Sequence, residues 1–351
     1  MKVIENNLPI KILGTGTSLP SNPPVSNIDI LKLLPENKQL SDLELEKKSK
    51  DLKERYGFSQ RYMVRMPEIH TIPDDIKNKE ETSEDLSLKA CKHAIAQTNE
   101  MAIEAFIHGT TTTRRYTGSQ STSILGKCNS KAPAFEIKAG CSTSLVSLHA
   151  AWGILSLGYD NVLVSCAETE SKVINPQMPA TYYILADGGA AVWIEKNETE
   201  PDFVIIKSMY GTDGTLVNLF TTRGTLPPLK SHIDSLGYVL SGDGKRMKME
   251  AINAYKKMIE TMLPDESSRK HIKWIIPHQI NKSIIDEACM LTGLSGEYIW
   301  DSFDIGNIGG ASVLYSLAKA IKDNKFVSGD EILLMSVGGG LSYAIQHWIK
   351  K

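Results

Sequence analysis

Hydrophobic residues along the chain form short β-rich runs that alternate with stretches of helical periodicity. In the first half the runs at 10–13, 105–109, 135–139, 162–166 and 190–195 predict strands, and the amphipathic stretches 83–98 and 142–157 predict helices. In the second half strands are predicted at 203–210, 274–276 and 331–336, and helices at 247–263, 282–291 and 311–322. This alternation indicates an α/β fold.

The second half of the chain repeats the pattern of the first. The run 135–137 before Cys141 parallels 303–305 before Asn307, and 159–165 parallels 329–335. An internal duplication is the simplest explanation, and we expect one half over residues 1–198 and the other over 199–351. Two copies of one unit would place Cys141 and Asn307 at equivalent strand ends, with a site at their junction.

Two polar stretches do not follow this alternation. The charged run 37–53 predicts a solvated helix, and 67–84, which contains Pro73 followed by two aspartates, predicts a loop.

The composition limits the class of protein. With 351 residues, 41% hydrophobic and 23% charged, the chain can bury a large core. A formal net charge of −2 favours neither a nucleic acid nor an anionic membrane as partner. Five cysteines without a CxxC pair disfavour disulfides and structural zinc. We find no signal peptide and no apolar run of membrane length, and expect a soluble cytoplasmic protein, mature as written.

Cys141 stands between the predicted strand 135–139 and the predicted helix 142–157, and Gly140 permits a tight turn before it. The unpaired N–H groups and partial positive charge of a helix N-terminus lower the pKa of a nearby thiol. We therefore expect Cys141 to ionise near neutral pH and to act as a nucleophile. The alternative for each of the five cysteines is that of a small, inert core residue, but only Cys141 has this strand–glycine–helix context.

His278 and Asn307 are the other candidates for chemistry. His278 follows the strand 274–276 and lies in a loop before a helix, where open α/β sheets carry catalytic groups. His149 and His347 fall within a predicted helix and strand, which favours structural roles. Asn307 lies in a glycine-rich turn, where asparagine also occurs simply because it tolerates left-handed backbone geometry. Whether Asn307 has a catalytic role or only a structural one depends on the residues that lie next to it.

Three motifs carry a resemblance to a known family: AGCS at 139–142, PHQIN at 277–281 and GNIGGAS at 306–312. In this order they resemble β-ketoacyl-[acyl-carrier-protein] synthase III, a thiolase-like condensing enzyme. Further matches lie at 14–16, 19–20, 186–191 and 338–340. The resemblance implies a thiolase-like five-layered αβαβα fold built from two duplicated halves, and a homodimer. Degradative thiolases are disfavoured because the loop 338–341 has no second cysteine.

By this resemblance Cys141 would take an acyl group as a thioester, and His278 with Asn307 would bind the carbonyl of a malonyl thioester. Decarboxylation leaves an enolate, whose oxygen two fixed N–H donors stabilise. The backbone N–H groups of Cys141 and Gly339 are the candidates for the oxyanion hole. No metal or other cofactor is implied; the substrates are carried on the phosphopantetheine of acyl carrier protein or on coenzyme A.

Several positions depart from the family pattern. Arg55 matches an arginine that holds coenzyme A, but Asp51 and Pro179 replace two residues that stack on its adenine, which makes an acyl-CoA primer less expected. Val337 replaces a phenylalanine that shields the decarboxylation site, which predicts room for a bulkier second substrate. Tyr116 matches an aromatic residue at the floor of the partner subunit's acyl pocket.

Lys245, Arg246 and Lys248 form a basic cluster that suits an acidic carrier protein or a pantetheine phosphate, or is simply the solvated start of a helix. We predict a decarboxylative Claisen condensation of a Cys-bound acyl primer with a malonyl- or 3-oxoacyl-type thioester on acyl carrier protein, in fatty-acid or specialised-metabolite biosynthesis. One alternative is acyl transfer to a hydroxyl or amine without loss of CO2. Another is a silent partner of an active paralogue.

Overall fold

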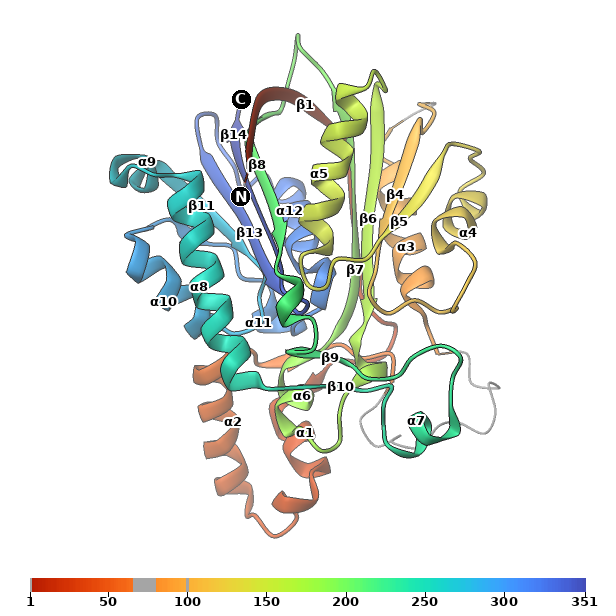
Figure 1. The fold of residues 1–351 in the computed structure, drawn as a ribbon, viewed down its shortest axis with the longest axis vertical. Helices are drawn as coiled ribbons and strands as arrows, with labels where there is room; N and C mark the ends of the chain where they lie inside the picture. Colours follow the sequence, from red (N-terminus) through yellow and green to blue (C-terminus); the bar gives the residue numbers. More distant parts are fainter. Residues whose placement is uncertain (1, 66–79, 99–100) are drawn as a thin grey trace.

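The computed structural model describes residues 2–65, 80–98 and 101–351, and a ten-stranded β-sheet forms its centre (Figure 1). The order of the strands is β12-β11-β13-β14-β8-β1-β7-β6-β4-β5. Their bounds are β1 Val3–Ser18, β4 Ala105–Gly109, β5 Ala134–Ile137, β6 Asn161–Thr169, β7 Asp187–Lys196, β8 Phe203–Thr212, β11 Ile272–Pro277, β12 Glu297–Tyr298, β13 Glu331–Gly338 and β14 Ser342–Lys350. Two small sheets pair β2 Val25–Ser26 with β3 Gln60–Arg61 and β9 Phe220–Thr222 with β10 Leu240–Gly242.

The helices connect and cover these strands. Their bounds are α1 Asn27–Leu33, α2 Asp42–Tyr56, α3 Ser83–Ile95, α4 Gln120–Lys127, α5 Thr143–Ser156, α6 Pro179–Ile184, α7 Lys230–Asp234, α8 Gly244–Met262, α9 Glu266–His271, α10 Lys282–Thr292, α11 Ser302–Ile305 and α12 Ser312–Lys322. Short 3-10 segments include η2 Glu170–Val173 and η4 Gly309–Ala311. Within the described part of the chain, no helix is long and apolar enough to cross a membrane.

The sheet contains the same strand order twice. In the first half it runs β5-β4-β6-β7-β1, and in the second half β12-β11-β13-β14-β8. In each half the first three strands are parallel and the last two pair antiparallel. The antiparallel pair β1–β8 joins the halves. This repetition confirms the predicted duplicated fold. The division between residues 198 and 199 falls between β7 and β8 and stays a prediction.

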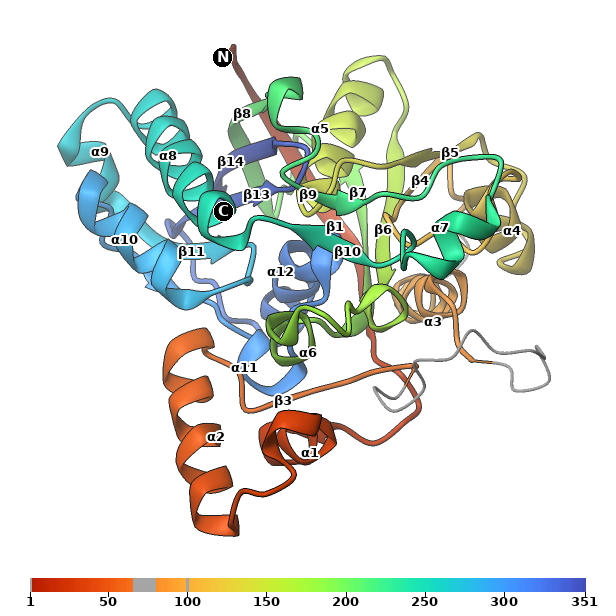
Figure 2. The same cartoon turned by 60° about the horizontal axis from the view of Figure 1, so that its bottom comes forward.

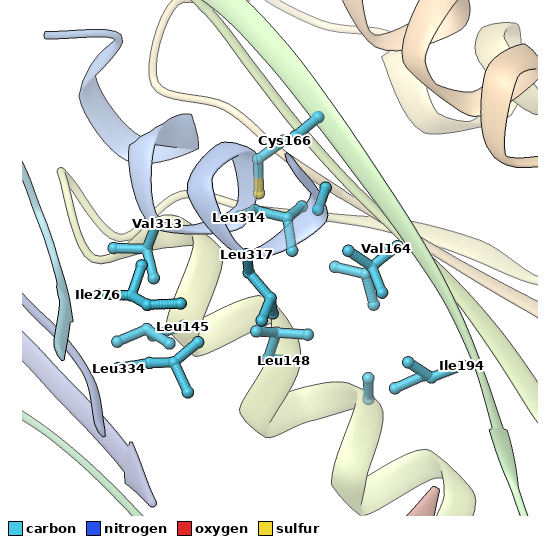
Figure 3. Packing of buried hydrophobic residues seen from close by; sticks show 14 of the residues in the cluster. Leu145, Leu148, Val164, Cys166, Ile194, Ile276, Val313, Leu314, Leu317 and Leu334 are labelled. Carbon is cyan, nitrogen blue, oxygen red and sulfur yellow. The ribbon is translucent and has the colours of Figure 1, made fainter. Parts of the chain in front are cut away.

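The protein is built in five layers, with helices between the two halves of the sheet and helices on its outer faces. Helices α5 and α12 lie between the two halves of the sheet (Figures 1 and 3). Leu145 and Leu317 from these helices pack in one cluster with Val164 of the first half and Leu334 of the second (Figure 3). On the outer faces, α3 packs against the first half, and α8 and α10 pack against the second. The central helices are therefore apolar on most sides, which makes them the core of the protein.

Most predicted elements are present; most strands are longer than predicted, whereas β5, α3, α5 and α12 are shorter. The run 10–13 is the middle of the sixteen-residue β1, which pairs with both β7 and β8 and has a bulge after Ile12 on its β7 side. Strand β12 was not predicted, and β14 is the strand in which His347 was expected. The charged run is a helix, α2, which begins at the Ser41 capping box and ends at the left-handed Gly57. Of the predicted loop 67–84, residues 67–79 lie outside the described residues, and α3 already begins at Ser83.

The figures show how the layers are arranged around the strand ends. In Figure 2 the hairpin β9–β10 crosses the bottom of the molecule, between α8 and the segment that carries α7. Helices α1 and α2 project below the layered body in Figure 1. The segments that follow β5 and β13 lie close together, since a Cβ atom at Gly140 would lie 2.7 Å from the carbonyl oxygen of Gly339.

Candidate active site

Cys141 lies in the turn that joins β5 to α5. The strand ends at Ile137, and the helix begins at Thr143 with Ser142 at its N-cap. Gly140 has a φ of 55°, and a Cβ atom there would lie 2.7 Å from the carbonyl oxygen of Gly339. Both the left-handed backbone and the close approach require glycine. The predicted tight turn is therefore present.

The second half of the fold holds this turn in place. A Cβ atom at Gly338, the last residue of β13, would overlap the backbone nitrogen of Cys141. The Ser142 hydroxyl donates to the carbonyl of Ser342 (3.1 Å), and the Ser342 hydroxyl donates to the carbonyl of Ala139 (2.6 Å). The position of Cys141 thus depends on contacts between residues two hundred positions apart.

The prediction that Cys141 ionises near neutral pH is wrong. Part of Cys141 is accessible to solvent, but protein surrounds its thiol, and this burial raises the pKa of Cys141 to about 12. The negative charges of Glu170 and Glu168 raise the pKa further. A hydrogen bond from the backbone N–H of Gly339 to the sulfur acts in the opposite direction and is outweighed. The helix N-terminus alone does not decide the charge of this thiol.

His278 is fully buried directly after β11. Its backbone N–H donates to the carbonyl of Met335 (2.8 Å), and its Nδ1 lies 2.8 Å from the hydroxyl oxygen of Ser312. Burial lowers the pKa of His278 to about 3, so the imidazole is neutral. Its Nε2 makes no hydrogen bond within the described residues. When Ser312 donates to Nδ1, Nε2 carries the hydrogen and is a free donor.

Asn307 is fixed by three hydrogen bonds. Its backbone N–H donates to the carbonyl of Ile184 (3.0 Å), and its carbonyl accepts from the N–H of Ala186 (2.9 Å). Its side-chain Oδ1 accepts from the N–H of Gly309 (3.0 Å). Since the oxygen is held within the turn, the amide nitrogen is the end of the side chain that is left to donate.

The turn 307–312 connects the three candidates. A Cβ atom at Gly310 would lie 3.0 Å from the carbonyl oxygen of Gly140, beside Cys141. The Ser144 hydroxyl of α5 donates to the carbonyl of Gly310. Ser312, at the end of the same turn, contacts His278. The structure therefore brings the strand ends of both halves around one turn, as the duplicated pattern predicted.

Two carboxylates near this turn were missed in the sequence. Glu168, the penultimate residue of β6, accepts hydrogen bonds from the backbone N–H groups of Thr111 (2.9 Å) and Thr112 (3.1 Å). Glu170 opens η2, is 6% exposed, and its Oε1 lies so close to Gly309 that a Cβ atom would overlap it. Burial raises the pKa of both carboxyl groups. Two acidic residues at the end of a buried apolar strand were the available signal.

A polar pocket of about 700 Å³ opens beside the site. Its lining residues include Leu219, Arg223, Gly242 and Arg246. The next residue after Leu219 is Phe220, whose carbonyl oxygen would lie 2.5 Å from a Cβ atom at Gly339. The pocket therefore adjoins the glycine loop that contacts Cys141.

The predicted basic cluster is only partly in this pocket. Arg246 lines it together with Arg223, which was not predicted. Lys248 instead pairs with Glu287 of α10 at 3.7 Å, and Lys245 is exposed but not among the lining residues.

The remaining predicted binding residues lie elsewhere. Arg55 is exposed on α2, with its guanidinium 5.2 Å from the ring centre of Tyr56, and it does not line this pocket. Tyr116 is 75% exposed in the loop after β4. Val337 is buried, and its N–H donates to the hydroxyl of Tyr255 (3.2 Å), so an aromatic residue from α8 lies beside it.

This fold and this site define a thiolase-like condensing enzyme. Two family models match the chain: 3-oxoacyl-[acyl-carrier-protein] synthase III over residues 135–214, and the C-terminal model of the same synthase over residues 265–349. A β-ketoacyl-[acyl-carrier-protein] synthase III of Clostridium kluyveri is 31% identical over 280 residues, which cover 76% of this chain and 84% of that protein. The chain belongs to the β-ketoacyl-[acyl-carrier-protein] synthase III family, a family of acyltransferases.

Other relatives extend the match over nearly the whole chain. A β-ketoacyl-[acyl-carrier-protein] synthase III of Clostridium perfringens is 27% identical over 342 residues, or 95% of this chain and 97% of that protein. The crystal structure of 3-oxoacyl-(acyl carrier protein) synthase III from Pseudomonas aeruginosa superposes with a TM-score of 0.79 at 19% identity, covering 97% of this chain and 98% of that one. The predicted fold and family are confirmed.

Proposed function

We propose that this protein joins an acyl primer held on Cys141 to a malonyl- or 3-oxoacyl-type thioester on acyl carrier protein, with loss of CO2 when the second substrate is malonyl. One observation supports this most directly. The turn 307–312 contacts all three groups: it contains Asn307, its Gly310 packs on the backbone beside Cys141, and its Ser312 contacts the neutral, buried His278. Within the described residues, Nε2 of His278 has no hydrogen-bond partner.

Each group has a task in this proposal. The Cys141 sulfur replaces the carrier sulfur at the primer's thioester carbonyl, and the thiol proton of Cys141 passes to the departing carrier thiolate. The N–H groups of Gly339 and Cys141 stabilise the tetrahedral oxyanion. After acylation, Nε2 of His278 and Nδ2 of Asn307 donate to the carbonyl oxygen of the malonyl thioester. Decarboxylation places negative charge on that oxygen, which two buried donors stabilise better than water does. The resulting carbon nucleophile attacks the acyl group on Cys141.

Two neutral donors favour condensation over the alternatives. Acyl transfer to a hydroxyl or amine needs a base for the acceptor, and His278 is a weak base because burial lowers its pKa to about 3. A silent partner would not need a complete set of nucleophile and donors. We therefore place the enzyme in fatty-acid or specialised-metabolite biosynthesis as a condensing enzyme.

The pocket of Arg223 and Arg246 is the proposed route for the carrier's phosphopantetheine arm. Guanidinium groups bind phosphate well, and the pocket adjoins the loop of Gly339. Lys245 would add positive charge at the rim for an acidic carrier protein. Arg55 lies outside this pocket, in line with a carrier-bound primer in preference to acyl-CoA.

Two further assignments stay proposals. The exposed Tyr116 would close the acyl pocket of a partner subunit in a homodimer, and Tyr255 would take up part of the space that Val337 leaves near the second substrate.

The test is to incubate the protein with an acyl donor and a malonyl carrier protein and to measure CO2 and the 3-oxoacyl product. Both are expected, and Cys141→Ala should abolish the acyl-enzyme seen by mass spectrometry. Acyl transfer to a hydroxyl or amine without CO2 would replace this proposal by the acyltransferase alternative. No mass shift on Cys141 with any acyl donor would favour the silent partner.

A further inference from the structure

Ser336 of β13 has a fully buried hydroxyl that no residue in the described part of the chain binds. The chemistry described above does not use it. A hydroxyl buried without a hydrogen-bond partner destabilises the folded protein. Such groups are rare in native structures, so each one needs an explanation.

Ser336 faces the central helices. Along β13, Leu334 belongs to the core around α5 and α12, whereas Leu333 and Met335 belong to the outer core with α8 and α10. In Figure 3 the side chain of Leu334 lies beside Leu145 of α5. The pairing of β13 with β14 is regular over the whole strand, so its side chains alternate between the two faces without interruption. Ser336 is therefore on the same face as Leu334.

His278 lies beside Ser336 on this face. Strand β11 runs parallel to β13 with Pro277 paired to Met335, and the N–H of His278 donates to the carbonyl of Met335 (2.8 Å). The next pair along these strands is His278 and Ser336, on backbones about 4.8 Å apart. The contact between Nδ1 of His278 and Ser312 of α12 shows that the imidazole also faces the central helices. Two buried polar side chains, each with an atom that no described residue binds, are thus neighbours.

Ser336 is also close to the nucleophile along its own strand. Gly338 is two residues further on the same face, and a Cβ atom there would lie 2.9 Å from Cβ of Cys141. Two residues of a strand span about 6.6 Å. The Ser336 hydroxyl is therefore one strand spacing from His278 and two residues from the contact with Cys141.

We propose that the Ser336 hydroxyl is a third donor to the carbonyl oxygen of the second substrate, beside Nε2 of His278 and Nδ2 of Asn307. This role rests on the proposed function. The hydroxyl keeps its hydrogen and donates it to an oxygen that becomes negative as CO2 leaves. Since the hydroxyl has no partner among the described residues, it can turn toward this oxygen without losing a hydrogen bond to the protein. A donor that is in place before the reaction stabilises the developing charge without rearrangement.

The first test separates the half-reactions. Wild type, Ser336→Ala and Ser336→Thr are acylated on Cys141, and the malonyl-dependent loss of the acyl group is timed by quench and mass spectrometry. Acylation of Ser336→Ala should stay within about twofold of wild type. Its condensation should slow by at least about tenfold, because loss of one oxyanion donor costs about 100- to 1000-fold and two donors remain. Ser336→Thr keeps the hydroxyl and should recover most of the rate. Condensation by Ser336→Ala within about twofold of wild type would overturn the role.

Ser165→Ala is the matched control for stability. Ser165 is equally buried, on β6, but its hydroxyl lies 2.7 Å from the hydroxyl of Ser87 and 3.1 Å from Nδ1 of His108. Ser165→Ala should lower the melting temperature and leave both half-reactions within about twofold of wild type. Ser336→Ala should keep or raise the melting temperature, because it removes an unpaired buried hydroxyl. A fall as large as that of Ser165→Ala would show that the Ser336 hydroxyl serves the fold, and would refute its role as a substrate donor.

A second measurement does not depend on condensing activity. Acetoacetyl pantetheine has the thioester carbonyl but no carboxylate to lose, and its binding is measured by calorimetry in a Cys141→Ala background. Adding Ser336→Ala should weaken binding by about fivefold, the contribution of one neutral hydrogen bond, whereas adding Ser165→Ala should not. If wild type does not condense but the Cys141→Ala protein binds this thioester, the proposed function fails while the difference in affinity still decides the placement of Ser336. Equal affinities with and without the hydroxyl would refute that placement.

Discussion

Gly310 offers a direct test of how closely the two halves meet at the site. A Cβ atom at this position would lie 2.9 Å from Oε1 of Glu168, 3.0 Å from the carbonyl oxygen of Gly140 and 3.0 Å from Cβ of Thr143. Each contact is tighter than ordinary packing allows, and the backbone oxygen and the hydrogen-bonded carboxylate cannot move away easily. Gly310→Ala should therefore lower the free energy of unfolding by about 1–3 kcal/mol, as overpacking in a core does.

The same change should push the turn of Asn307 away from Cys141. We expect slower acylation of Cys141 as well as a lower urea midpoint by circular dichroism. Gly153→Ala is the matched control, because Gly153 is exposed within α5 and nothing lies within 4 Å of its Cβ position. Alanine there should stabilise the helix by about 0.5–1 kcal/mol. A Gly310→Ala protein as stable and as readily acylated as the parent would refute the packing argument.

Three further predictions concern charge and hydrogen bonding. Ser312→Ala leaves Nδ1 of His278 without its hydrogen-bond partner and should lower the free energy of unfolding by about 1–3 kcal/mol. It should also slow condensation more than acylation. Equal slowing of both half-reactions would contradict the role of this hydrogen bond. Burial lowers the pKa of His278 to about 3 in the folded protein, against about 6.5 unfolded. Stability contributed by its neutral form is therefore lost as the pH falls below about 6.5, and His278→Gln should flatten this loss in acid titrations of the urea midpoint. Asp187, whose pKa burial raises to about 6, has an opposite slope, but it is present in both proteins and cancels in the difference. Arg246→Ala should raise the KM for malonyl carrier protein several-fold and make it less dependent on salt. Lys248→Ala should change the KM little, because Lys248 pairs with Glu287 of α10. A larger effect of Lys248→Ala than of Arg246→Ala would show that the carrier binds elsewhere.

At Cys141 the local backbone followed from the sequence, but the pKa of the thiol did not. The motif before the helix correctly predicted a tight turn that needs glycine, because both features depend on backbone geometry within a few residues. The predicted thiolate was wrong, because the pKa depends on burial and on Glu168 and Glu170, which lie some thirty residues away. Sequence spacing carries no information on how much solvent reaches a thiol.

The basic cluster illustrates the same limit. The run from Lys245 to Lys248 has the right charge, but on a helix successive side chains point in different directions. Arg246 faces the pocket and Lys248 faces α10, and the second arginine of the pocket, Arg223, comes from a separate loop. The composition of this run predicted its positive charge but not the direction in which each side chain points.

By itself the sequence determined the order of strands and helices, the repeat of one unit and the three motifs of the site, since periodicity and turn chemistry are local properties of the chain. Only the tertiary structure decided that Ser312 contacts His278, that Glu170 packs on the turn of Asn307 and that burial raises the pKa of the Cys141 thiol. Those features come from contacts between the two halves, where burial changes the energies of charged groups far more than any neighbour in sequence does.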